Sequence, residues 1–142
     1  MKKTIILLTG LILLTSCNST NKKSTNIAQN QEKSTLQESI KRGKLVYNDM
    51  CTTCHLPDGK GVPKVFPPLA DSDYLRDNQV NSIKAVKYGL SGEILVNNIT
   101  YNSIMSPLGL SNQEVADVIN YINNSWGNKI DNVATPEKVS EL

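Results

Sequence analysis

Five consecutive residues, Cys51-Thr52-Thr53-Cys54-His55, constrain this chain more than any other stretch. Two thiols three positions apart at the end of a helix can both form thioethers with the vinyl groups of one porphyrin, and the adjacent histidine then lies under the iron. The run therefore predicts one covalently bound haem c, attached through Cys51 and Cys54, with His55 as the proximal iron ligand. The porphyrin would be the centre of the core as well as the reactive group.

Two other kinds of site share part of this pattern. A redox dithiol of the thioredoxin kind also has Cys-x-x-Cys, but it needs a strand-helix setting and no adjacent histidine. A zinc site needs four ligands, whereas His55 is the only histidine in the sequence and Cys17 is the only thiol outside the motif. Haem is therefore the interpretation that the run favours.

The composition agrees with a small domain that is built around a large apolar group. The sequence has 142 residues and one region of globular character, which indicates one domain. It contains one Phe and one Trp, although aromatic residues supply much of the buried area in small cores. A haem would supply the missing apolar volume.

Residues 1–16 have the organisation of a secretory signal peptide. Lys2 and Lys3 precede an apolar run of about 16 Å of helix, which is too short to cross a bilayer core of about 30 Å. The run ends in Leu14-Thr15-Ser16-Cys17, which resembles the lipobox of bacterial lipoproteins; an ordinary signal peptide with a chance cysteine is the alternative. The resemblance implies export and a lipid on Cys17 that anchors the protein to a bacterial membrane, with the haem domain in the periplasm or otherwise outside the cytoplasmic membrane.

Removal of the signal would leave a formally neutral chain. The sequence has 15 Lys and Arg against 13 Asp and Glu, and the two excess lysines belong to residues 1–16. No basic block remains, so nucleic acid is excluded as a partner. Residues 17–35 are mostly Asn, Ser, Thr, Lys and Gln, and we expect them to form a lipidated cysteine followed by a flexible polar tether.

Hydrophobic spacing predicts helices on both sides of the haem motif within a domain at residues 36–127. A helical stripe runs from Leu36 to Cys51 and leads into the motif. Apolar residues between positions 71 and 90 also follow helical spacing, and Gly89 is placed to end that helix. Turn formers and prolines fill the segment that joins these helices.

The rest of the chain predicts a hairpin, a further helix and a tail. Residues 94–101 have β-branched arms on either side of Asn97-Asn98 and favour a short β-hairpin. Ser111 and Glu114 form a capping box, so a helix begins there. Residues 128–142 are expected to be a polar C-terminal tail.

Taken in order, these features resemble a class I cytochrome c over residues 36–127. The motif, Gly43 and Tyr47 in the helix before it, Pro67-Pro68-Leu69 after it, a later loop methionine and a final helix all match. The resemblance implies an all-α fold of three to four helices around one covalently bound haem. It also implies that the final helix crosses the first at Gly43 and Tyr47.

Three further residues are candidates for the haem pocket, and the resemblance implies the roles of the first two. The Pro67 carbonyl is expected to accept a hydrogen bond from Nδ1 of His55, and Leu69 is expected to pack on the haem face. Tyr101 either points its hydroxyl toward a haem propionate or is a half-exposed residue of the hairpin. The sequence leaves these two alternatives for Tyr101 open.

Met105 is the candidate for the second axial ligand. Met1 would leave with the signal, and Met50 shares a helix with the attachment cysteines, so only Met105 can approach the distal face. A loop methionine of this kind resembles the distal ligand of class I cytochromes c, although the family usually has proline directly after it and this chain has Met105-Ser106-Pro107. The alternative is a methionine that fills a gap in the core.

Ligation by histidine and methionine predicts an electron carrier and not an enzyme, because no coordination site is left for a substrate. We expect single-electron transfer between respiratory or periplasmic redox proteins, by a monomer or by part of a complex. A dedicated electron-transfer subunit of a dehydrogenase, nitrite reductase or terminal oxidase is the alternative. A five-coordinate haem peroxidase or gas sensor is less favoured, since the chain shows no evident distal acid or base.

Overall fold

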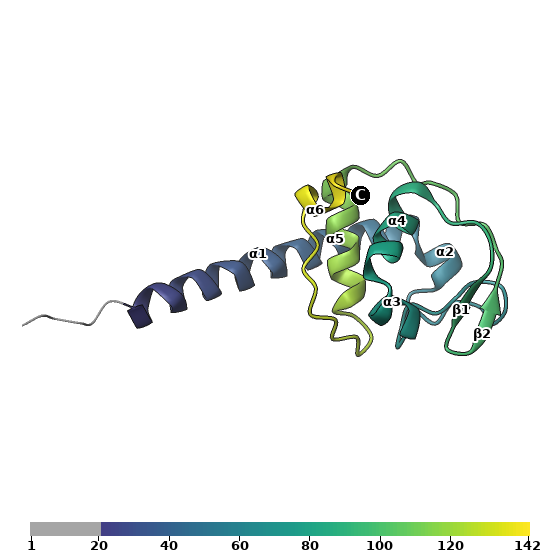
Figure 1. The fold of residues 1–142 in the computed structure, drawn as a ribbon, viewed down its shortest axis with the longest axis horizontal. Helices are drawn as coiled ribbons and strands as arrows, with labels where there is room; N and C mark the ends of the chain where they lie inside the picture. The colour runs from purple at the N-terminus through teal and green to yellow at the C-terminus, as the bar shows by residue number, and fades with distance from the viewer. Residues whose placement is uncertain (1–20) are drawn as a thin grey trace, which may run out of the picture.

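The computed structural model describes the backbone of residues 21–142 and the side chains from residue 35 onward. A long helix enters a rounded domain in which shorter helices and a small hairpin are arranged in a ring (Figure 1). The elements are α1 (Asn21–Met50), α2 (Thr52–His55), α3 (Asp73–Asp77), α4 (Gln79–Tyr88), β1 (Ile94–Val96), β2 (Ile99–Tyr101), α5 (Asn112–Asn123) and α6 (Pro136–Ser140). The predicted helical fold with one short hairpin is confirmed.

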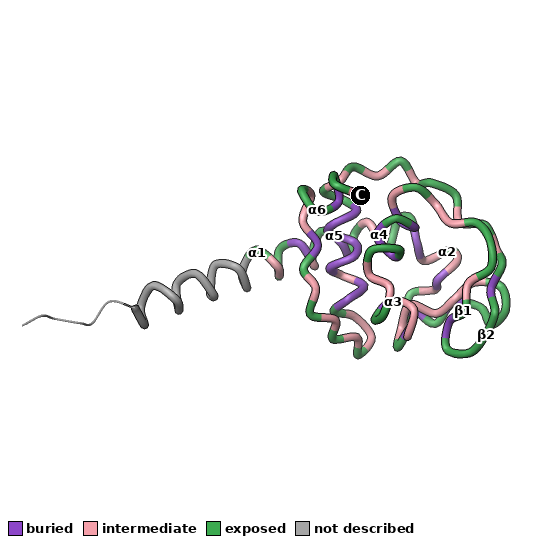
Figure 2. Tube along the Cα trace, viewed as in Figure 1, coloured by how far each residue is buried: buried purple, intermediate pink, exposed green. Residues whose placement is uncertain are grey.

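Among the described elements, α1 and α5 make the most extensive contact with each other. A Cβ atom at Gly43 would overlap the carbonyl oxygen of Asp117 and lie 2.9 Å from Cβ of Tyr121. Tyr47, one turn after Gly43, is fully buried, and so is Val118 in α5. Figure 2 shows buried residues along most of α5. The predicted crossing at Gly43 and Tyr47 is therefore present.

The start of α5 and its polar anchor are both set by side chains. Ser111 accepts a hydrogen bond from the backbone of Glu114, whose carboxylate accepts one from the backbone of Ser111, so the predicted capping box is confirmed. The buried carboxylate of Asp117 accepts hydrogen bonds from Ser39 Oγ at 2.6 Å and Arg42 Nε at 2.7 Å. These contacts tie α5 to α1.

The segment at residues 71–90 contains two helices, whereas the spacing of its apolar residues predicted one helix. The helices α3 and α4 meet at Asn78, which has φ −129° and ψ 50°. Asparagine favours helix ends because its side chain competes for backbone hydrogen bonds. Gly89 ends α4 as predicted. Val80, on the expected stripe, is 52% exposed.

The predicted hairpin at residues 94–101 is present. Its two strands are antiparallel, with Ile94 opposite Tyr101. Asn97 and Asn98 form the turn, with φ of 51° and 60°. Asparagine tolerates this left-handed backbone better than most residues, which is why it is common in two-residue hairpin turns.

The amino-terminal side of the domain differs from the prediction. Helix α1 begins at Asn21, so most of the segment 17–35 that was expected to be a flexible tether is helical. A helix that is already stabilised by packing extends readily through residues of fair helix propensity, such as Lys, Gln, Glu and Ala. The predicted signal peptide and Cys17 lie outside the described residues. Within residues 21–142, none of the helices combines the length and apolarity needed to cross a membrane.

Residues 128–142 also differ from the prediction of a polar tail, because they pack against the domain. Val139 of α6 is fully buried and Ala134 is nearly so. The carboxamide of Asn120 donates to the Ala134 carbonyl and accepts from its N–H, each at 2.9 Å. Lys87 Nζ of α4 donates to the Val139 carbonyl at 2.7 Å. The folded domain therefore continues past residue 127.

Candidate haem site

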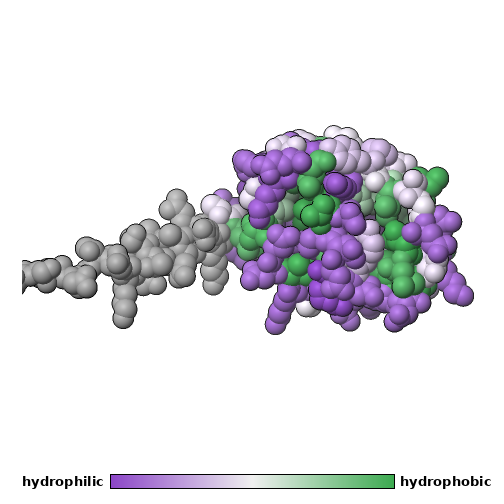
Figure 3. All heavy atoms as spheres, in the orientation of Figure 1, coloured by the Kyte–Doolittle hydropathy of each residue, from purple (hydrophilic) through white to green (hydrophobic). Residues whose placement is uncertain are grey.

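A cavity of about 600 Å³, measured with its open mouth, is lined by residues of α2, α3, α4, α5 and β1. A second opening of about 450 Å³ adjoins it and shares part of its wall. The shared residues are His55, Pro67, Leu90, Ile94 and Met105. Apolar residues gather in Figure 3 over the region that α3, α4 and the hairpin surround. The cavity therefore suits a large apolar ligand with an edge near the surface.

The two cysteines of the motif face this space from the junction of α1 and α2. Cys51 lines the first opening and Cys54 the second, and neither is in a disulfide. Burial raises the pKa of the Cys51 thiol to about 11, so this thiol is protonated at neutral pH. A catalytic redox dithiol needs the opposite shift, toward a stable thiolate. The pair therefore fits covalent attachment of a ligand better than dithiol chemistry.

The ring of His55 is buried and has one fixed orientation. Its Nδ1 lies 3.0 Å from the Pro67 carbonyl oxygen, which can only accept, so Nδ1 carries the proton and Nε2 keeps its lone pair. Burial lowers the pKa of the imidazole and outweighs the opposing effect of the Pro67 carbonyl. A neutral imidazole with a fixed tautomer is the form that binds a metal. The hydrogen bond expected from the family resemblance is present.

Short backbone contacts hold the Pro67 segment against the motif. The carbonyl of Gly59 accepts from the N–H groups of Leu69 at 2.7 Å and Ala70 at 2.9 Å. The N–H of Gly61 donates to the His55 carbonyl at 3.0 Å. Leu69 is partly buried and lines the cavity, as expected for a residue that packs on a haem face.

Three aromatic rings support this loop from behind. Tyr47, Tyr121 and Trp126 contact one another, with ring centroids 4.9 to 5.5 Å apart. Trp126 Nε1 donates to the Pro57 carbonyl at 3.0 Å, and the Tyr47 hydroxyl donates to the Leu56 carbonyl at 2.7 Å. Sequence reasoning missed this support. The available signal was two aromatic residues near the end of one predicted helix.

Met105 enters the cavity from a separate segment. It pairs with Leu90 through two backbone hydrogen bonds, of 2.9 Å from its own N–H and 2.8 Å to its carbonyl. Its side chain lines both openings together with His55. Met50, the other methionine whose side chain the structure describes, is 43% exposed and is not among the lining residues. One thioether sulfur and one imidazole are thus brought to the same space.

Tyr101 lies in the wall of the second opening, beside Cys54 and Ser103. It is 3% exposed, so it is not the half-exposed hairpin residue that was one of the two alternatives. Strand pairing explains its position, because Tyr101 lies opposite Ile94, which also lines the opening. Its hydroxyl remains a predicted partner for a propionate.

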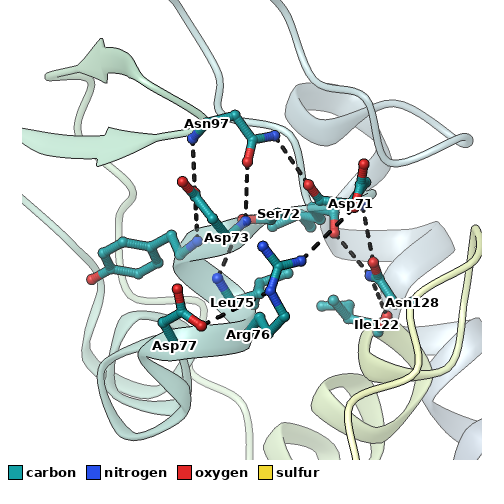
Figure 4. Close-up of polar contacts among 11 residues, drawn as sticks. Asp71, Ser72, Asp73, Leu75, Arg76, Asp77, Asn97, Ile122 and Asn128 are labelled. Carbon is teal, nitrogen blue, oxygen red and sulfur yellow. Dashed lines mark hydrogen bonds and ion pairs between the residues drawn. The ribbon is translucent and has the colours of Figure 1, made fainter.

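A polar network fastens the hairpin to the beginning of α3 (Figure 4). The N–H of Asp73 donates to the Asn97 side chain at 3.0 Å, and the N–H of Asn97 donates to the Asp73 carboxylate at 2.7 Å. Asn128 holds the same corner, since its carboxamide accepts from the Asp71 N–H and donates to the Leu69 carbonyl, each at 2.9 Å. The network therefore holds the hairpin, the start of α3 and the backbone of Leu69 in fixed positions relative to one another.

The donor set around the cavity fits a haem. It consists of two thiols, a neutral imidazole and a thioether, set in a mainly apolar wall. Among the residues whose side chains the structure describes, no three His, Cys, Asp or Glu residues come together to bind a metal ion directly. A porphyrin would bring its own four nitrogen ligands, so the chain would need to supply only axial ligands and attachment points.

The family model of Cytochrome c matches residues 40–126, which include every residue that lines the cavity. The chain belongs to the cytochrome c family. It has the class I cytochrome c fold and is a monohaem electron carrier with one covalently attached haem c. The predicted fold, cofactor and general role are therefore confirmed.

Two relatives illustrate the range of proteins that contain such a cytochrome c domain. The chain is 34% identical over 104 residues to the cytochrome c subunit of alcohol dehydrogenase (quinone) from Gluconacetobacter polyoxogenes. This aligned region covers 70% of this chain and 22% of the relative. The chain is 38% identical over 82 residues to cytochrome c-552 from Thermus thermophilus, which covers 54% of this chain and 63% of the relative. The matched part spans about a fifth of the first relative and less than two thirds of the second.

Proposed function

We propose that this cytochrome c domain passes single electrons between redox proteins, with His55 and Met105 as the two axial ligands of the haem iron. The observation that carries the proposal is that these two side chains, from separate segments, line the same cavity. A bound haem supplies a one-electron iron couple. With both axial positions filled by the chain, a small substrate has no coordination site.

The residues of the cavity have distinct roles in this proposal. Cys51 and Cys54 would hold the porphyrin by two thioethers. The Pro67 carbonyl holds the proton on Nδ1, so Nε2 of His55 would be the atom that binds the iron. The soft sulfur of Met105 would favour the ferrous state.

The wall of the cavity contributes to the same preference for the reduced state. Apolar residues, Leu69 among them, exclude water and lower the local dielectric, which disfavours the additional positive charge of ferric iron. Tyr101, in the second opening, would donate a hydrogen bond from its hydroxyl to a haem propionate in this proposal. The reduction potential is therefore expected to be higher than that of a haem with two hard ligands.

Absorption spectra of the mature haem protein test the ligation. The ferric protein should show the charge-transfer band of methionine sulfur on iron. Met105→Ala should abolish this band, whereas Met50→Ala is the matched control and should keep it, because Met50 lies outside the cavity. A high-spin native spectrum with ready binding of cyanide or carbon monoxide would contradict the proposal and favour a five-coordinate haem protein.

The proposal includes export and anchoring through a lipid on Cys17. The support is the charged and apolar organisation of residues 1–16 and the lipobox resemblance of Leu14-Thr15-Ser16-Cys17. Cells fed radiolabelled palmitate should label the wild-type protein and not Cys17→Ser, and the variant should leave the membrane fraction. Equal membrane binding of both proteins would refute the anchor.

A second candidate is a dedicated electron-transfer subunit of an oxidoreductase. It is favoured by the relatives that are cytochrome c subunits of alcohol dehydrogenase (quinone). The two candidates differ in how long the partner stays bound. Purification in mild detergent should leave a shuttle alone on a sizing column, whereas a subunit should elute with a larger protein in fixed proportion.

A further inference from the structure

Gly89 lies where the chain leaves α4 and turns toward residues 105–107, which are called the Met105 segment below. Its backbone has φ 81° and ψ 175°, a region that is essentially restricted to glycine. The N–H of Gly89 donates to the Ala85 carbonyl at 2.9 Å and so closes the end of the helix. This role was expected from the sequence and would by itself explain a glycine here.

The surroundings of Gly89 show a second role, which is close contact with the Met105 segment. A Cβ atom at this position would lie 2.5 Å from the carbonyl oxygen of Met105 and 2.9 Å from both Cδ and N of Pro107. Real Cβ atoms essentially never approach other atoms within 3.0 Å. The bare backbone of Gly89 therefore sets how closely this segment can approach α4.

Leu90, the residue after Gly89, fixes the alignment of the Met105 segment with the end of α4. Leu90 and Met105 exchange two backbone hydrogen bonds, of 2.8 and 2.9 Å, and form an isolated antiparallel bridge. Both side chains line the cavity. If the Met105 carbonyl moved away from Gly89, the bond from the Leu90 N–H to that carbonyl would lengthen. The position of the Met105 sulfur would then change with its backbone.

Pro107 gives the contact its second surface. Ser106 lies between Met105 and Pro107 in the chain. The ring of Pro107, two residues after Met105, packs against Gly89. It also restricts Ser106 to an extended backbone. Pro107 therefore stiffens the Met105 segment through its contact with Gly89 at the end of α4.

We propose that Gly89 and Pro107 are positioning residues that seat the Met105 segment against the end of α4 and thereby hold the Met105 sulfur on the distal side of the haem. The inference rests on the proposed function, because it requires Met105 to be a ligand. Neither residue is among those that line the two openings of the cavity. Their contribution is the free energy that keeps the sulfur in place against a competing ligand.

Two other glycines supply matched controls. Gly92 and Gly109 also have positive φ, of 92° and 70°, and a Cβ built on either one has no atom within 4 Å apart from those of the glycine and its two chain neighbours. Alanine at these positions would carry the strain of a left-handed backbone without touching the Met105 segment. Comparison with them separates the contact at Gly89 from the general cost of replacing a turn glycine.

The experiment titrates each ferric haem protein with imidazole, which competes with Met105 for the iron, and records the methionine charge-transfer band. Gly89→Ala should weaken the band and bind imidazole roughly tenfold more tightly than wild type, since overpacking a tight contact displaces backbone. Gly92→Ala and Gly109→Ala should stay within about twofold of wild type, because their new methyl groups meet open space.

The outcomes separate the inference from the proposed function. If the wild-type protein lacks the band, Met105 is not the ligand and the proposed function fails. If the wild type has the band but Gly89→Ala matches Gly92→Ala in imidazole affinity, the ligation holds and the seating role is overturned.

A second pair of variants keeps the test decisive if Gly89→Ala yields no haem protein. Pro107→Ala removes the ring that packs on Gly89, and Ser106→Ala is its control on the neighbouring exposed residue. Pro107→Ala should bind imidazole several-fold more tightly than Ser106→Ala, because the segment loses its rigid contact. Equal affinities for imidazole would overturn the inference.

Discussion

The part of the domain where α1 and α5 cross and the part that surrounds the cavity are built in different ways. At the crossing, Tyr47, Val115 and Val118 are fully buried among other side chains. Around the cavity, Leu69 and Met105 are only partly buried, because part of their surface faces the open space. The chain can therefore complete the crossing with its own residues, whereas the cavity half needs the haem to become a packed core.

The largest expected effect comes from blocking haem attachment in Cys51→Ser/Cys54→Ser. Loss of the central apolar group should lower the free energy of unfolding by an amount comparable with the whole stability of a small domain, roughly 5–15 kcal/mol. Hydrogen exchange should show the comparison directly, with residual protection of backbone amides in α5 and little in α3, α4 and the hairpin.

The control for this experiment is Cys17→Ser, which leaves the motif unchanged and should keep the holoprotein's protection pattern. Equal loss of protection in both halves of the haem-free chain would contradict the comparison. It would mean that the crossing also depends on the haem.

Gly43→Ala should break the half that the chain builds by itself. The added methyl group would overlap the Asp117 carbonyl, so the two helices must separate. We expect the free energy of unfolding to fall by about 3 kcal/mol or more, at the upper end of overpacking effects. Urea unfolding followed by circular dichroism measures this loss. Lys44→Ala, on the exposed side of the same helix, should change the stability by less than about 0.5 kcal/mol.

Val139→Ala tests whether residues 128–142 belong to the crossing half. Val139 is fully buried, and its truncation should cost about 2 kcal/mol from lost burial and the cavity that remains. Val133→Ala is a close match, since the same residue type in the same segment is 41% exposed. Its effect on the urea midpoint should be small. Equal effects of the two substitutions would show that the tail does not pack as described.

Asn97→Gly tests how the cavity half is held at its corner. Glycine keeps the left-handed turn but removes the side chain that contacts Asp71 and Asp73, which should cost about 1 kcal/mol. Asn98→Gly has the same backbone requirement, with φ 60°, and is the control. Faster hydrogen exchange in the hairpin of Asn97→Gly alone would show that the Asn97 side chain supports the cavity half. Identical exchange in both variants would argue against the network as a support of the cavity.

Much of this organisation could be predicted because it depends on short patterns with a local physical cause. The haem motif, the capping box that begins at Ser111, the helix end at Gly89 and the turn at Asn97-Asn98 each follow from neighbouring residues. The bond from His55 to the Pro67 carbonyl was reached through the family resemblance. Backbone geometry alone would not have singled out this carbonyl.

The features that were missed depend on contacts between distant residues. The packing of the tail rests on Asn120, a buried amide in α5 whose partners are far away in the sequence. An asparagine within a helix gives no indication of what it will bind. Val139 is similarly inconspicuous in a polar segment, and Trp126 acts through a loop that precedes it by many residues.

The continuity of α1 with the haem motif has a mechanical consequence. Thirty residues of helix from Asn21 to Met50 measure about 45 Å. With a lipid on Cys17, four positions before the helix, the length of this rod would set how far from the membrane the haem domain can reach. Shortening α1 by whole turns would then change the reach of electron delivery in steps of about 5.4 Å.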